Sequence, residues 1–284
     1  MSLLQPGVPV EIETEAVRVR RVLGLNPGPM TGPGTNTYLI GTDKLTLIDP
    51  GPIDAEQFNN FLAAIGDSSL VNILVTHTHG DHSPGALALA KHTGATLIGL
   101  NAPQAPGQDH SFVSDIACVD GDIIECQDSA GCYSLQMIHT PGHVSNHLCF
   151  LLKEEGLLFT GDHVLQGTTP VILPPDGDMS EYLSSLERLL SLPLISLAPA
   201  HGEVMRAPFA EIEKLIAHRL KREAKIFDRL RLLSPCTDDE LVISAYDDVG
   251  EHLLPWAKRT MSAHLIKLAK EGKAQFDESH WRVL

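Results

Sequence analysis

The sequence predicts an α/β fold in which two β-sheets pack face to face, followed by a helical C-terminal subdomain. Short apolar strands alternate with amphipathic helices through the first 200 residues or so of the 284. Strand patterns largely stop after residue 206, where helical patterns take over. Histidine and aspartate residues cluster where predicted strands end. Two packed sheets with helices outside is the arrangement that buries the apolar face of every such element.

The predicted elements of residues 1–100 mix strands with helices. Residues 17–23 alternate in character, and two apolar runs around Gly41-Thr42-Asp43 are typical of a hairpin. The Gly/Pro-rich stretch 26–36 between them is expected to be a loop. The strands are expected at 17–23, 38–40, 45–48, 71–75 and 96–100, and the helices at 54–65 and 85–91.

The remaining elements divide into a strand-rich and a helical part. Strands are expected at 123–125, 133–138, 147–152, 157–159 and 194–197, with a helix at 181–190. Helices are then expected at 207–233, after Thr237 and at 253–272, with a hairpin at 274–284. We therefore predict a catalytic domain at 1–205 and a C-terminal domain at 206–284. Three helices before a hairpin favour a winged-helix-like subdomain, and a plain helical subdomain is the alternative.

The charge of the chain is unevenly distributed. Residues 1–205 contain 7 basic and 23 acidic side chains, a net charge of −16, whereas residues 206–284 have a net charge of +1. The acidic part suits cations and disfavours a broad nucleic-acid surface. The five cysteines form no CxxC pair and are expected to be free thiols. Since we see no signal-peptide pattern and no apolar run near the roughly 18 residues of a membrane span, we expect a cytoplasmic protein without a membrane partner. The sequence does not determine the oligomeric state.

The segment Thr76-His77-Thr78-His79-Gly80-Asp81-His82 follows an apolar strand and precedes a helix. His77 and His79 alternate at the strand end, so both rings can point the same way. The turn at Gly80 lets Asp81 and His82 face the same space. Imidazole nitrogen and carboxylate oxygen are both ligands of zinc, so this segment predicts a metal site.

Four further motifs accompany this segment, and together they resemble the metallo-β-lactamase superfamily. They are Ile48-Asp49-Pro50-Gly51, Thr140-Pro141-Gly142-His143, Thr160-Gly161-Asp162 and Ala200-His201-Gly202. The resemblance implies an αββα metallo-β-lactamase sandwich, and all five motifs stand in the order of that family.

The resemblance also implies a site for two metal ions. His77, His79 and His143 would hold the first ion. Asp81, His82 and His201 would hold the second, and Asp162 would bridge both. Asp49 would orient the histidine loop through hydrogen bonds, with turn capping as the alternative role. Two Zn²⁺ are expected, although this ligand set also accepts Mn²⁺ or Fe.

The implied chemistry is hydrolysis by a metal-bridging hydroxide that Asp81 orients. His147 or His163 is a candidate general acid, and the alternative for each is a packing or hydrogen-bonding histidine. The candidate substrate-binding residues are Thr35, Asn36, Thr37, Thr168 and Thr169. For the first three of these, a self-bonded turn is the alternative.

Three features are the loop at residues 34–39, the turn at residues 140–143 with His147, and Gly161-Asp162 followed by Gly167-Thr168-Thr169. In these the chain resembles most the β-lactamase-like protein 2 branch of the superfamily, whose animal members are endoribonucleases. The glutathione-binding segment of glyoxalase II-type enzymes has no counterpart in residues 163–171. The expected substrate is an ester, a thioester or a phosphodiester. One alternative is an endoribonuclease on single-stranded RNA, guided by the basic cluster Arg219, Lys221, Arg222 and Lys225. For this cluster, a solvated helix face with i,i+4 pairs such as Arg219–Glu223 is the other interpretation. A non-enzymatic metal-binding scaffold is the third hypothesis.

Overall fold

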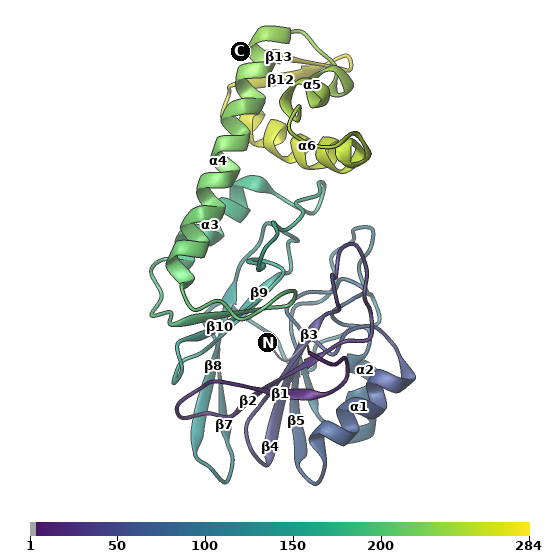
Figure 1. Ribbon diagram of the computed structural model, residues 1–284, viewed down its shortest axis with the longest axis vertical. Helices are drawn as coiled ribbons and strands as arrows, with labels where there is room; N and C mark the ends of the chain where they lie inside the picture. Colours follow the sequence, from purple (N-terminus) through teal and green to yellow (C-terminus); the bar gives the residue numbers. More distant parts are fainter. Residues whose placement is uncertain (1–3) are drawn as a thin grey trace. The chain divides into compact units, whose positions relative to one another are not determined.

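The computed structural model describes residues 4–284, which form two compact units (Figure 1). The first unit comprises the described residues up to Thr140, together with Asn146–Pro170 and Leu192–Phe209. The second unit comprises Pro141–Ser145, Val171–Ser191 and Ala210–Leu284. Two short segments from within residues 1–205 therefore group with the C-terminal part. The division into a catalytic domain at 1–205 and a C-terminal domain at 206–284 stays a prediction.

The first unit begins with a sheet of six strands in chain order. Its first four strands are antiparallel, while β4, β5 and β6 run parallel. The helix between β4 and β5 begins where predicted, because Asp54 accepts a hydrogen bond from Gln57 N at 2.7 Å. The elements are β1 Pro9–Ile12, β2 Val19–Leu23, β3 Asn36–Ile40, β4 Lys44–Ile48, α1 Ala55–Ile65, β5 Ser69–Leu74, α2 Ala86–Thr93 and β6 Thr96–Ile98.

The second sheet of this unit has five strands in the order β11-β10-β9-β8-β7. They are β7 Ile123–Gln127, β8 Cys132–His139, β9 Leu148–Leu152, β10 Leu157–Gly161 and β11 Ser196–Pro199. Strands β10 and β11 are parallel, so their carboxyl ends lie at the same edge of the sheet.

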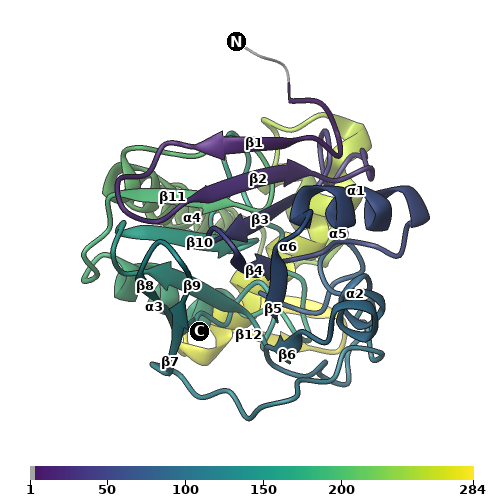
Figure 2. The same cartoon turned by 90° about the horizontal axis from the view of Figure 1, so that it is seen from below.

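The core of the first unit lies between the two sheets. Tyr38 of β3 and Phe159 of β10 meet there with ring centroids 5.0 Å apart, and both side chains are buried. A second apolar cluster, which includes Phe61 and Leu89, joins the other face of the first sheet to α1 and α2. Figure 2 shows these two helices beside the first sheet. The two-sheet prediction is thus confirmed for this unit.

The second unit contains the predicted helices and the terminal hairpin. Thr237 begins its helix with a capping box, because its hydroxyl accepts from Glu240 N and the Glu240 carboxylate accepts from Thr237 N. Trp281 of the hairpin and Met261 share one core. The elements are α3 Met179–Leu189, α4 Pro208–Leu233, α5 Asp238–Ala245, η1 Glu251–Leu253, α6 Leu254–Lys270, β12 Ala274–Asp277 and β13 His280–Val283.

Across residues 4–284, no helix combines the length and the apolar character that crossing a membrane requires.

Candidate metal centre

The histidine segment after β5 forms a compact, largely buried loop in the first unit. His82 N donates to His79 O at 3.0 Å, which closes the turn at Gly80. His77 Nε2 lies 3.0 Å from His79 Nδ1, and the His77 and His82 ring centroids are 4.0 Å apart. The loop therefore gathers three imidazole rings, as the spacing of the motif predicts.

One carboxylate and one further imidazole face this loop from within the same unit. Asp162 follows β10 and His201 follows β11, so the parallel pairing of these strands brings both to one edge. His82 Nε2 lies 3.6 Å from Asp81 Oδ2 and 3.5 Å from Asp162 Oδ1. His201 Nε2 lies 3.3 Å from each of the same two oxygens. Two imidazole nitrogens and two carboxylate oxygens thus converge on one point.

The tautomer of the His82 ring shows whether a metal ion fits there. Its Nδ1 lies 2.9 Å from Asp49 Oδ2, and a carboxylate accepts, so Nδ1 carries the proton of the neutral ring. The lone pair is then on Nε2, which is buried and has no hydrogen-bond partner within residues 4–284. Potential ligand atoms of His77, His82 and Asp162 lie within 4.8 Å of one another, as do those of Asp81, His82 and His201. This donor set fits a metal ion such as zinc.

The electrostatics of the cluster favour a cation. Burial by itself would lower the pKa of His82, but the carboxylates of Asp81, Asp162 and Asp49 outweigh burial and hold that pKa well above its usual value. The pKa of His201 is raised in the same way: burial opposes the rise, and Asp162 and Asp81 cause it. Burial would raise the pKa of Asp81, but His82 and His201 keep it below its usual value. The carboxylate of Asp81 is therefore ionised at neutral pH.

Asp49 joins β4 to the histidine loop. Its Oδ1 accepts from Thr76 N at 2.8 Å, and its Oδ2 accepts from Thr76 Oγ1 at 2.7 Å as well as from His82. Asp49 has a φ of 53°, a left-handed conformation that a non-glycine residue adopts at a cost. One carboxylate thus orients both ends of the loop. Thr76 was not among the predicted site residues, although it opens the motif.

His147 positions Asp162 through the backbone. Asp162 N donates to His147 Nε2 at 3.2 Å, so the ring proton is on Nδ1, which lies 2.8 Å from Thr140 Oγ1. This geometry favours the hydrogen-bonding role over the general-acid role. His163 is 0% exposed, with its ring centroid 5.6 Å from that of His147. Its role as a general acid stays a prediction.

The backbone at Gly161 explains why a glycine precedes Asp162. Its φ is 48°, and a Cβ there would lie 2.7 Å from both His147 Nε2 and Thr76 Oγ1. A larger residue would displace the side chains that hold the two loops. The predicted motif included Gly161, but the sequence does not indicate which side chains Gly161 contacts.

The segment 35–37, predicted to bind substrate, makes internal hydrogen bonds. Asn36 Nδ2 donates to Pro199 O at 3.0 Å and to Gly202 O at 2.8 Å, which braces the loop that carries His201. His201 Nδ1 in turn lies 3.4 Å from the carbonyl oxygen of Gly34, so its Nε2 points toward the carboxylates.

The hydroxyls on either side of Asn36 are bonded as well. Thr37 Oγ1 donates to Asp49 O at 2.6 Å, and Thr35 Oγ1 accepts from Asn26 Nδ2 at 2.9 Å. All three side chains of the segment are buried and bond to other segments, and Asn36 and Thr37 lie in strand β3, so the segment does not form a self-bonded turn. Substrate binding by these residues stays a prediction. Thr168 and Thr169 are exposed, so they are accessible to a ligand.

His143 lies in the second unit, in the turn Pro141–Ser145. Its ring is buried, and its Nδ1 donates to Val171 O at 2.6 Å because a carbonyl oxygen can only accept. In the neutral ring the lone pair is therefore on Nε2. This is the tautomer of a histidine that binds metal through Nε2.

The basic cluster predicted to guide RNA is largely neutralised within the second unit. Arg219 is only 3% exposed, and its guanidinium lies 5.4 Å from the centroid of the Tyr182 ring. Arg222 and Lys225 each lie 2.9 Å from a carboxylate oxygen of Asp248. Arg219, Arg222 and Lys225 thus have partners within the second unit, which disfavours an RNA surface at these positions. The RNA-guiding role of the cluster stays a prediction.

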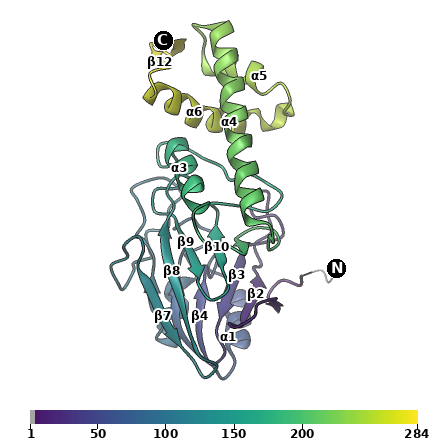
Figure 3. The same ribbon diagram turned by 90° about the vertical axis from the view of Figure 1, so that its left-hand side faces the viewer.

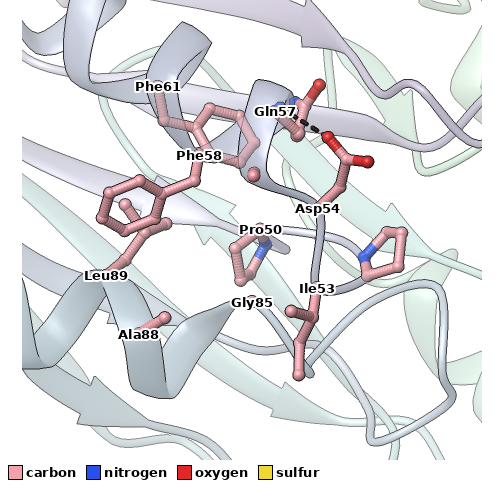
Figure 4. A pocket seen from close by; sticks show the side chains of 11 residues that line it. Pro50, Ile53, Asp54, Gln57, Phe58, Phe61, Gly85, Ala88 and Leu89 are labelled. Atoms are coloured by element: carbon pink, nitrogen blue, oxygen red, sulfur yellow. Dashed lines mark hydrogen bonds between the residues drawn. The ribbon is translucent and has the colours of Figure 1, made fainter.

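An apolar pocket of about 310 Å³ lies between α1 and α2 (Figure 4). Phe58, Phe61 and Leu89 form its walls, with Pro50 and Gly85 beside them. Among the described residues, none of the predicted metal ligands lines it. The pocket is therefore distinct from the metal centre.

Comparison with known proteins identifies the family. Residues 30–201 match the metallo-beta-lactamase superfamily. The chain belongs to this superfamily. Residues 237–281 match the beta-lactamase-associated winged helix domain, which confirms the winged-helix prediction over the plain helical one.

Two relatives and one solved structure show how far the similarity extends. A beta-lactamase-like protein 2 homolog of Drosophila melanogaster is 33% identical over 274 residues, which cover 92% of this chain and 91% of the relative. An atrochrysone carboxyl ACP thioesterase of Claviceps purpurea is 33% identical over 287 residues, covering 96% and 86%. A metallo-beta-lactamase family protein of Thermus thermophilus has a TM-score of 0.75 at 21% identity, covering 95% and 99%, and supports the fold alone. The chain is a metal-dependent hydrolase of this superfamily.

Proposed function

We propose that the chain is a hydrolase with a binuclear zinc site. His77, His79 and His143 hold the first ion, and Asp81, His82 and His201 hold the second. Asp162 is shared between them. The observation that carries this proposal is the convergence of His82 Nε2 and His201 Nε2 on the Asp81 and Asp162 carboxylates, at 3.3 to 3.6 Å. The motif Thr140–His143 and the tautomer of His143 support its place at the first ion.

Two zinc ions in such a site lower the pKa of water and supply a nucleophile near neutral pH. The Asp81 carboxylate, besides helping to hold the second ion, would accept a hydrogen bond from that water and orient it. Asp49 and His147 hold the loops in place, the first through Thr76 and His82 and the second through Asp162 N. These residues keep the ligands in position before the substrate arrives.

We propose a thioester or ester as the substrate. The relative from Claviceps purpurea is named a thioesterase, and one with the same name in Aspergillus fumigatus is 36% identical over 300 residues. The net charge of −16 on residues 1–205 and the internal pairing of Arg222 and Lys225 disfavour a polyanion. Cleavage of single-stranded RNA is the second candidate, favoured by the likeness to the beta-lactamase-like protein 2 homologs.

The test uses full-length protein loaded with two equivalents of zinc. Thiol release from a short acyl thioester and cleavage of a labelled single-stranded RNA are measured side by side. Asp81→Asn is the matched control, since it keeps the side-chain shape and removes the carboxylate that helps to hold the second ion and orients the water. We expect thioester hydrolysis that falls by about 10²- to 10⁴-fold in Asp81→Asn. RNA cleavage that Asp81→Asn abolishes, without thioester hydrolysis, would establish the second candidate instead.

A further inference from the structure

The turn that presents His143 is held by helix α3 of the same unit. Ser185 Oγ donates to Pro141 O at 2.9 Å, and Asp178 N donates to Gly142 O at 2.9 Å. These two bonds occupy consecutive carbonyl groups just before His143. The position of the turn therefore follows the position of α3.

Gly142 packs directly against the backbone of Tyr182 in α3. A Cβ on Gly142, whose φ is 136°, would lie 2.3 Å from the Cα of Tyr182. The two backbones are thus in direct contact, and only glycine fits. A shift of α3 at Tyr182 cannot be absorbed by side-chain rotation and has to move the turn.

Helix α4 holds α3 at the same residue. Tyr182 is fully buried, and the nearly buried guanidinium of Arg219 lies 5.4 Å from its ring centroid. Figure 3 shows α4 passing α3 within this unit. Arg219 thus fixes the residue against which Gly142 rests.

Helix α6 holds the N-terminal end of α3. Asp178 caps α3 with Oδ1, which accepts from Ser180 N at 2.8 Å and Glu181 N at 3.0 Å. Its Oδ2 is paired with Lys270 Nζ, near the end of α6. One aspartate therefore bonds to α6 through its side chain, to α3 through its cap, and to the turn through its backbone N–H.

We propose that helices α3, α4 and α6 hold the turn that carries His143 in place, and that Arg219 and Lys270 are positioning residues for His143. The inference rests on the proposed role of His143 as a zinc ligand. A metal ion binds more tightly to a ligand that is already in place, because binding does not have to order it. Loosening α3 from α4 or α6 should therefore weaken zinc binding without altering any ligand.

Four variants of the full chain test this, namely His143→Ala, Arg219→Met, Lys270→Met and the control Lys273→Met. Lys273 pairs with Glu271 close in sequence to Lys270. Zinc affinity is measured by competition with a chromogenic chelator, and hydrogen exchange is measured at the Asp178 amide. We expect zinc affinity to fall about 10-fold in Arg219→Met, at the lower limit for residues that orient ligands. For the half-exposed pair of Lys270 we expect a fall of roughly 2- to 5-fold. Both variants should speed exchange at Asp178, and Lys273→Met should change neither quantity.

The outcomes separate this inference from the proposed function. If His143→Ala binds two zinc ions as tightly as the unchanged protein, the ligand role of His143 is wrong. If His143→Ala loses one ion while Arg219→Met and Lys270→Met bind zinc normally, the scaffold inference is wrong and the ligand role stands. Lys270 is exposed, so its variant decides the question even if Arg219→Met does not fold.

Discussion

Replacing Gly161 by alanine adds a single methyl group, yet it should lower both the stability of the protein and its affinity for zinc. Two costs combine at this position. Placing a Cβ at a φ of 48° costs about 1–2 kcal/mol. Contacts of 2.7 Å with His147 Nε2 and Thr76 Oγ1 force both side chains to move, and such overpacking adds about 1–3 kcal/mol. We therefore expect Gly161→Ala to lower the free energy of unfolding by about 2–5 kcal/mol.

The displaced side chains are those that hold Asp162 and the histidine loop. His147 would release Asp162 N, and Thr76 would shift with its two bonds to Asp49. Changes to groups that orient ligands lower metal affinity by about 10- to 100-fold. We expect a loss in this range for zinc bound to Gly161→Ala.

The assay pairs denaturant unfolding with zinc affinity measured by chelator competition. Gly32→Ala is the matched control, since Gly32 has a φ of 58° and no atom of the described residues 4–284 lies within 4 Å of a Cβ built there. The control should lose about 1–2 kcal/mol and keep its zinc affinity. If Gly161→Ala folds, and its stability and zinc affinity equal those of the control, crowding at Gly161 does not position the ligands and the reasoning fails.

Three further predictions follow from individual contacts. His147→Ala should lower the free energy of unfolding by about 1–3 kcal/mol, because the buried N–H of Asp162 loses its acceptor; a stability unchanged in urea unfolding would contradict the assigned bond. Zinc binding at neutral pH should release protons and weaken as the pH falls, because the pKa of His82 is raised and its ring must lose a proton to bind metal. Calorimetry in buffers of different ionisation enthalpy measures this proton release, and identical binding heats in all buffers would refute the prediction. Burial would raise the pKa of Asp178, but Lys270 and the first amides of α3 outweigh burial and lower it. The charge of Asp178 therefore stabilises the fold above its usual pKa of about 4, and this contribution is lost as the pH falls below that value. The difference in melting temperature between the wild-type protein and Asp178→Asn should shrink in acid, and a constant difference would count against this prediction.

The local features of this protein were predictable because they depend on neighbours in the chain. The histidine segment between β5 and α2 follows from its spacing, and the start of α5 follows from Thr237 and Glu240. The apolar runs predicted both sheets, since each strand must bury a face whatever its partner is. The order of the five motifs along the chain also indicated the superfamily.

Only the tertiary structure decided what many of these side chains contact. Asn36 and His147 look like substrate-side residues in the sequence, but their partners Gly202 and Asp162 lie 166 and 15 positions away. Arg219 reads as part of a basic surface, yet folding turns it toward Tyr182.

The second unit shows the same limit on a larger scale. The turn around His143 precedes β9, β10 and β11 in the chain but is held by α3 and, through Asp178, by Lys270, which is 92 positions further on. Sequence patterns report which residue types are present and which face is apolar. Hydrogen bonds and ion pairs between distant positions depend on where the folded backbone places them, and that information exists only in the three-dimensional structure.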